Sequence, residues 1–134
     1  MNTVTVELQI PDDLPFDLFV TAIEGGINYW FDVRAYRWMD DHKNDNLFGF
    51  YAKGYTWEDT HLEREMKMID RETMLKGIGL ILSLSDEELS LHGKYRDRIR
   101  NCVAAGGVDK VPDYDADDAD HVVQVGMFGK VIYG

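Results

Sequence analysis

The chain of 134 residues is long enough for one domain with its own hydrophobic core, and its 45% hydrophobic and 12% aromatic residues are typical of a globular protein. Its 14 Lys and Arg residues against 25 Asp and Glu residues give a net charge of −11, which disfavours direct binding to nucleic acid and favours a basic partner. A single cysteine, Cys102, excludes an internal disulfide and a cysteine-cluster zinc site.

No stretch of the sequence is typical of a targeting or membrane-spanning segment. Residues 1–10 alternate in polarity and carry Glu7, unlike a signal peptide, and the longest apolar run, residues 77–84, is far shorter than a membrane span. We therefore expect a cytoplasmic protein with no membrane partner.

The first elements along the chain are a strand and a helix. Apolar residues occupy every second position of residues 3–10, which predicts a half-buried strand that ends at Pro11. Asp12 or Asp13 is then expected to cap a helix that has Pro15 in its first turn. The apolar side chains of this helix recur at helical spacing, at Phe16, Phe19, Val20, Ile23, Ile27 and Trp30.

The middle of the chain predicts three more strands. Gly25 and Gly26 fall inside the helical pattern, where they either end the helix or allow another backbone to approach closely. Residues 33–39, 48–52 and 62–69 are the further strands, separated by polar loops. Consecutive strands with short connections predict antiparallel pairing.

Helices follow in the second half of the chain. Asp70 is a suitable N-cap for a helix over residues 71–84, whose apolar side chains cover most of its circumference, so we expect it to be the central buried helix. The Ser85–Glu88 pair predicts a capping box and a third helix that runs to about Ala105. The final helix is expected to begin near Asp115.

These elements predict a single α+β domain over residues 1–134. We expect a four-stranded, mostly antiparallel sheet with three to four helices packed on one face. The N-terminal strand is expected to be paired centrally, because an open strand at the edge of a sheet invites aggregation.

A run of aspartates before the last helix has the spacing of a metal loop, but the residues at two required positions do not match one. Asp113, Asp115 and Asp117 have the one-three-five spacing of a calcium loop, yet Asp118 stands where glycine is required and Gln124 where a bidentate glutamate is required. No metal or other cofactor is therefore predicted. The aspartates either start the helix or form a surface for a cationic partner.

On the last helix, Asp117, Asp120, His121 and Gln124 share one stripe, which we expect to be the exposed face. The first candidate site is this acidic face, made of Asp113, Asp115, Asp117, Asp118, Asp120, His121 and Gln124. An Asp–His pair at this spacing could also serve in proton transfer, although no nucleophile stands in a recognisable motif to complete a hydrolase site.

The second candidate site combines aromatic and basic residues. Arg96 and Arg100 share one helix face and could hold an anion, or could instead neutralise part of the acidic charge. Tyr29, Trp30 and Trp38 belong to an aromatic-rich stretch that serves either the core or a binding groove. The sequence lacks the glycine-rich motifs of nucleotide-binding loops.

Three segments of the chain resemble small acidic hypothetical proteins encoded by bacteriophages and prophages. These are residues 21–30 (TAIEGGINYW), 68–78 (MIDRETMLKGI) and 117–134 (DDADHVVQVGMFGKVIYG). The resemblance implies an accessory phage protein in a bacterial host cell, a class that often binds host machinery. It implies no catalytic residue.

The leading functional hypothesis is therefore a non-enzymatic, phage-encoded accessory protein. It would bind, or bind and inhibit, a basic host protein through its acidic surface. The alternatives are a protein that binds a small ligand or nucleotide-like anion, and a small hydrolase that uses an Asp/His pair. Homo-oligomerisation remains open.

Overall fold

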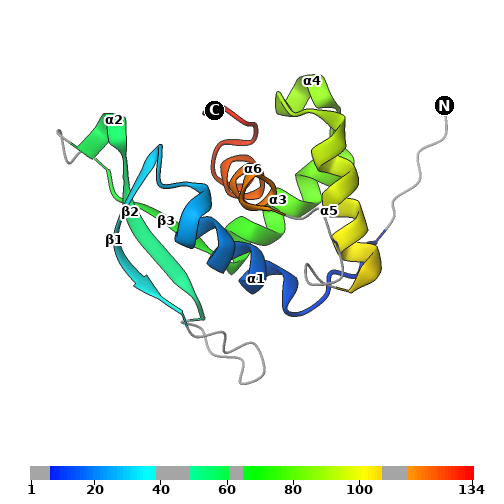
Figure 1. Ribbon diagram of the computed structural model, residues 1–134, viewed down its shortest axis with the longest axis horizontal. Helices are drawn as coiled ribbons and strands as arrows, with labels where there is room; N and C mark the ends of the chain where they lie inside the picture. The colour runs from blue at the N-terminus through cyan, green and yellow to red at the C-terminus, as the bar shows by residue number, and fades with distance from the viewer. Residues whose placement is uncertain (1–6, 39–48, 61–64, 107–114) are drawn as a thin grey trace.

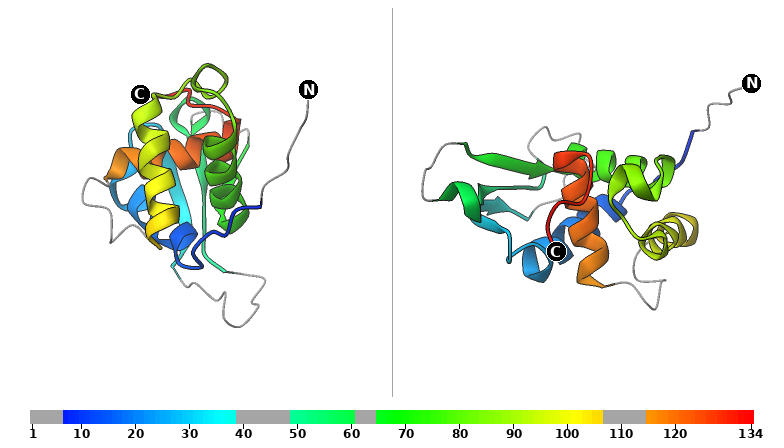
Figure 2. Two further views of the ribbon diagram at one scale, coloured as in Figure 1. Left: turned by 90° about the vertical axis from the view of Figure 1, so that its right-hand side faces the viewer. Right: turned by 90° about the horizontal axis from the view of Figure 1, so that it is seen from above.

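A three-stranded antiparallel sheet occupies one end of the molecule, and the longer helices lie on one side of it (Figures 1 and 2). The computed structural model describes residues 7–38, 49–60, 65–106 and 115–134. Its strands are β1 (Phe31–Arg37), β2 (Tyr51–Thr56) and β3 (Lys67–Asp70), in the order β1-β2-β3. The α+β class predicted from the sequence is confirmed.

The helices surround α6, which is seen end-on near the centre of Figure 1 and packs against α3, η1 and α1. They are α1 (Leu14–Thr21), the π-helical turn η1 (Ala22–Gly26), α2 (Trp57–Thr60), α3 (Arg71–Ser83), α4 (Asp86–Leu89), α5 (Gly93–Ala105) and α6 (Ala116–Phe128). In the described ranges, none of these helices has the length and apolar character needed to cross a membrane.

One face of the sheet is buried against the helices. Ala52 of β2 pairs with Ile69 of β3, and both side chains are fully buried. The adjacent pair, Lys53 and Met68, points to the opposite face because successive strand residues alternate, and Met68 is 46% exposed. Phe19 of α1 joins the helices to the buried side through its ring contact with Phe50, at 4.6 Å between centroids.

Two glycines allow α3 and α6 to pack backbone against backbone. A Cβ atom at Gly77 would lie 2.1 Å from the carbonyl oxygen of Val122, and one at Gly126 would lie 2.1 Å from the carbonyl oxygen of Thr73. Neither position can hold a larger residue unless the helices separate. Gly26 has a similar role, since its Cβ would lie 2.9 Å from the carbonyl oxygen of Ala116. Both alternatives left open for the glycine pair hold at Gly26, because η1 also ends there.

The predicted starts of α3 and α4 are confirmed by their hydrogen bonds, whereas Asp13 stands at the N-cap of α1 without a side-chain capping bond. Asp70 accepts from the Thr73 backbone N–H at 3.0 Å, and the Ser85 hydroxyl accepts from the Glu88 N–H at 3.2 Å. The single helix expected after Ser85 is wrong, however. Ser90 adopts a left-handed conformation with φ of 52°, which ends α4 before α5 begins.

The prediction of four strands is wrong for the described residues, which form three. Residues 7–10, the described part of the expected N-terminal strand, are not in a strand, and Leu8 is 55% exposed. Leu8 and Ile10 instead lie against α3 and α5, where they line a groove. The rest of that expected strand lies outside the described residues.

Candidate functional site

The start of α6 uses two of the aspartates as a capping box. The Asp115 carboxylate accepts from the backbone N–H groups of Asp117 and Asp118, at 2.9 and 3.3 Å, and the Asp118 carboxylate accepts from the N–H of Asp115 at 2.9 Å. These bonds satisfy backbone donors that a helix start leaves open. Asp113, also part of the proposed acidic face, lies outside the described residues.

The expected exposed stripe on α6 is wrong for Asp120 and Gln124, and Asp118 of the predicted acidic face is buried as well. Asp118 and Gln124 are fully buried and Asp120 is 3% exposed, whereas Asp115 and Asp117 are exposed. The reason is that α6, and not α3, is the central helix, so neighbouring elements cover almost its whole circumference. Of the described residues of the predicted acidic face, Asp115 and Asp117 are exposed and His121 is partly exposed.

Asp120 lies at the centre of a buried hydrogen-bond network that joins the two predicted sites. Its Oδ2 accepts from the Tyr29 hydroxyl at 2.6 Å, and its Oδ1 accepts from the Trp30 indole Nε1 at 2.8 Å and from Gln124 Nε2 at 2.9 Å. Burial, together with the hydrogen bond to Asp120, raises the pKa of Tyr29, so this hydroxyl remains a donor at neutral pH.

The same network holds the C-terminal segment. The Gln124 side-chain oxygen accepts from the backbone N–H groups of Ile132 and Tyr133, both at 2.8 Å. The Tyr133 ring stacks on Trp30, with centroids 5.0 Å apart and planes 9° apart. Because these contacts use the polar groups of Trp30, Asp120 and Gln124, we assign the network a structural role.

A second polar cluster lies between α5 and α6. Arg98 donates to Asp118 Oδ2 at 3.3 Å, while Asp118 Oδ1 and His121 Nδ1 are buried without a hydrogen-bond partner in the described structure. Burial raises the pKa of the Asp118 carboxyl, against the opposing effects of the Asp115 backbone and Arg98. Burial also lowers the pKa of His121, whose ring meets Tyr95 edge-on at 4.2 Å.

This cluster does not assemble the parts of the predicted Asp/His hydrolase. Both oxygens of Asp120 are bonded to other groups, and His121 Nδ1 has no hydrogen-bond partner in the described structure. Burial raises the pKa of the Cys102 thiol to about 11, so this residue remains an unreactive thiol. Within the described ranges, no set of three or more His, Cys, Asp or Glu residues is arranged to hold a metal ion.

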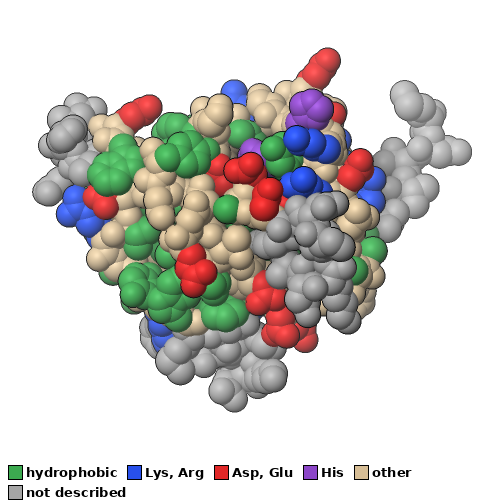
Figure 3. Space-filling view, in the orientation of Figure 1, with side chains coloured by type: hydrophobic (Ala, Val, Ile, Leu, Met, Phe, Trp, Pro, Cys, Tyr) green, Lys and Arg blue, Asp and Glu red, His purple; other side chains and the backbone are tan. Residues whose placement is uncertain are grey.

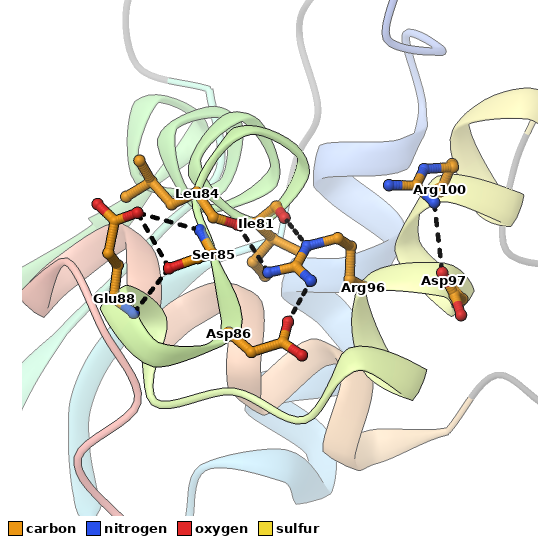
Figure 4. A network of polar contacts seen from close by, with 8 residues as sticks. All are labelled: Ile81, Leu84, Ser85, Asp86, Glu88, Arg96, Asp97 and Arg100. Atoms are coloured by element: carbon orange, nitrogen blue, oxygen red, sulfur yellow. Dashed lines mark hydrogen bonds and ion pairs between the residues drawn. The ribbon is translucent and has the colours of Figure 1, made fainter.

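The aromatic and basic residues of the second predicted site are not brought together. Arg96 donates to the carbonyl oxygens of Ile81 at 2.8 Å and Leu84 at 2.7 Å, and pairs with Asp86, so it fixes the end of α3 (Figure 4). Arg100, one turn further along α5, contacts Asp97 at 3.3 Å. Trp38 packs edge-on against Phe19 at 5.8 Å, beside the core.

Sequence reasoning missed an apolar groove of about 870 Å³ between residues 8–10, α3 and α5. Its signal was present in the sequence, because Leu75, Gly79 and Leu82 recur at positions i, i+4 and i+7 of α3. Because apolar side chains cover most of the circumference of this helix, the sequence predicts a central buried helix and no groove. The structure buries α3 on one side only and leaves the stripe, with Leu75 39% exposed, to line the groove.

The surface carries more acidic than basic side chains. Figure 3 shows Asp and Glu side chains in several separate groups over the face that holds η1 and the start of α6. The exposed carboxylates of the described residues are Glu7, Asp12, Asp13, Glu24, Glu58, Glu65, Glu72, Asp86, Glu87, Glu88, Asp97, Asp115 and Asp117. The exposed Lys and Arg residues are Arg34, Lys76, Lys94, Arg100 and Lys130.

Comparison of the chain with protein-family models, with curated proteins and with solved structures finds no match.

Proposed function

We propose that the protein is a non-enzymatic binding protein whose acidic surface meets a basic partner protein. The observation that carries this proposal is the excess of exposed carboxylates over exposed cations, in a chain of net charge −11. A field of one sign accelerates the encounter with an oppositely charged partner and rejects partners of like charge.

The resemblance to phage and prophage proteins supplies the biological setting of the proposal. An accessory phage protein in the bacterial cytoplasm would meet host proteins, many of which present basic grooves to nucleic acid. Occupation of such a groove by this acidic protein would inhibit the host protein. The acidic groups on the face drawn in Figure 3 are separate, so we expect this face to contact the partner at several points and not through one continuous patch.

Three acidic residues are suited to a test because their side chains form no hydrogen bond or ion pair in the described structure: Glu24 on η1, Glu87 on α4 and Asp117 on α6. By contrast, Asp115 and Glu88 hold helix starts, and replacing them would disturb the fold. The triple variant E24Q/E87Q/D117N therefore lowers the negative charge without removing a described contact.

The experiment immobilises the full chain, applies bacterial lysate, and elutes bound proteins with salt from roughly 0.05 to 0.5 M, a range in which the screening length falls from about 14 to about 4 Å. Basic proteins should elute early in the gradient, and the triple acidic variant should retain less of them. A matched variant with three cations removed, K76Q/K94Q/K130Q, should retain more. The proposal would be overturned if retention did not change with salt concentration or in either variant.

A further inference from the structure

The groove between α3 and α5 differs in chemistry from the rest of the surface. The left view of Figure 2 looks onto the side where the N-terminal segment passes these two helices. Six of the lining residues are apolar: Leu8, Ile10, Leu75, Leu82, Val103 and Ala104. A concave, mostly apolar space of about 870 Å³ lies within the range of small-molecule sites.

Gly79 helps to keep the groove open. It lies on the exposed side of α3, where an added Cβ would meet no heavy atom within 4 Å. A helix interior favours alanine over glycine by about 1 kcal/mol, so helix stability does not explain glycine at this position. Its missing side chain leaves room between Leu75 and Leu82 that a ligand chain could fill.

The groove also has a charge opposite to that of the molecule. Arg100 is its one charged lining residue in the described structure, and no carboxylate lines it. The Arg100 guanidinium lies 3.3 Å from Asp97, and the two side chains are 58% and 68% exposed. Such an exposed pair is weak, so a carboxylate that approaches from the groove can replace Asp97 and form two parallel hydrogen bonds.

From this geometry we infer that the groove binds an anionic single-chain amphiphile, with its carboxylate on Arg100 and its hydrocarbon tail along Leu75, Gly79 and Leu82. A nucleotide does not fit these walls, because it brings several negative charges and a polar base against one cation and an apolar lining. This site goes beyond the proposed acidic interface and uses different residues. A fatty acid is the occupant to which we commit.

The test measures binding of dodecanoate, and of 1-dodecanol as its uncharged counterpart, to the full chain by calorimetry below the micelle concentration. Dodecanoate should bind at least about tenfold more tightly than the alcohol, since a charge-assisted hydrogen bond contributes about 1.5–3 kcal/mol. R100Q should reduce dodecanoate binding to the level of the alcohol and leave the alcohol unchanged. D97N should tighten dodecanoate binding by about 2–5-fold, because it removes the competing carboxylate.

A second variant tests the groove itself. G79L should fill the groove and abolish binding of both probes, while its unfolding temperature stays at or above that of the wild type because the added atoms meet open space. K94Q changes a cation on the same helix outside the groove and should bind as the wild type does. Equal affinity for acid and alcohol, or unchanged binding in G79L, would overturn the inference. G79L should still retain basic proteins in the salt-gradient experiment. A failure of fatty-acid binding can therefore be distinguished from a failure of the acidic-surface proposal.

Discussion

Asp118 and Asp120 are both buried in α6, two residues apart, in different surroundings. Both carboxylate oxygens of Asp120 accept hydrogen bonds from side-chain donors, whereas Asp118 Oδ1 has no partner in the described structure. A buried charge stabilises a fold only when its hydrogen-bonding capacity is met. Asp120 therefore holds its neighbours together, whereas Asp118 accepts from the Asp115 N–H and pairs with Arg98 through one oxygen and leaves the other unpaired.

This contrast predicts responses of different size to the same substitution. D120N places an amide NH₂ group among donors and should lower the free energy of unfolding by about 2–4 kcal/mol. D118N removes an under-satisfied charge and keeps an acceptor for the Asp115 N–H, so it should change the free energy of unfolding by less than about 1 kcal/mol. Urea unfolding at pH 7 measures both. A larger decrease in the free energy of unfolding for D118N than for D120N would contradict the structural role assigned to Asp120.

His121 predicts a pH dependence of stability. Burial lowers its pKa below the ordinary value of 6.5, against the opposing charges of Asp120, Asp117 and Asp115. The unfolded chain therefore binds the proton first, and the free energy of unfolding should fall as the pH decreases through and below about 6.5. H121F keeps a ring against Tyr95 and removes the titration.

The measurement compares urea unfolding of the wild type and H121F between pH 7.5 and 5.5. The free energy of unfolding of H121F should rise relative to that of the wild type as the pH decreases. A constant difference between the wild type and H121F would show that His121 titrates alike in both states.

At the scale of elements, the crossing of α3 over α6 depends on glycine. G77A and G126A each place a methyl group against a backbone carbonyl, and the helices must then separate. We expect each to lower the free energy of unfolding by about 1–3 kcal/mol or more, as overpacked sites do. G79A, on the same helix as Gly77 but facing open space, should instead raise it by about 0.5–1 kcal/mol. Thermal unfolding distinguishes the three, and equal effects of G77A and G79A would refute the account.

The local features of these elements could be predicted from the sequence. The caps at Asp70 and Ser85 and a helix start near Asp115 could be predicted because capping depends on residues within one turn. The split of the third helix was missed, since Ser90 has no local feature that requires a left-handed conformation. Leu8 and Ile10 have the alternating spacing of a strand. They line a groove because of where α3 and α5 lie in the fold, which the local sequence does not show.

At the scale of the whole molecule, sequence pattern does not determine which helix is central. Both α3 and α6 carry apolar residues around much of their circumference, and α6 also carries Asp120 and Gln124, which suggested a solvent-facing stripe. Their partners, Tyr29 and Trp30, lie about ninety residues away along the chain. Burial of polar groups that are satisfied across such separations follows from the tertiary fold and is invisible to helical periodicity.

The Asp120 network also constrains how the chain reaches its native state. Its carboxylate accepts hydrogen bonds from Tyr29 and Trp30, which are 91 and 90 residues away along the chain. Closure of so long a loop is slow compared with formation of the local helices. Until that loop closes, packing α6 into the centre would bury an unsatisfied carboxylate, so the last helix cannot dock early. We therefore expect the barrier to folding to lie at this joining of the chain's two distant parts, after the helices have formed.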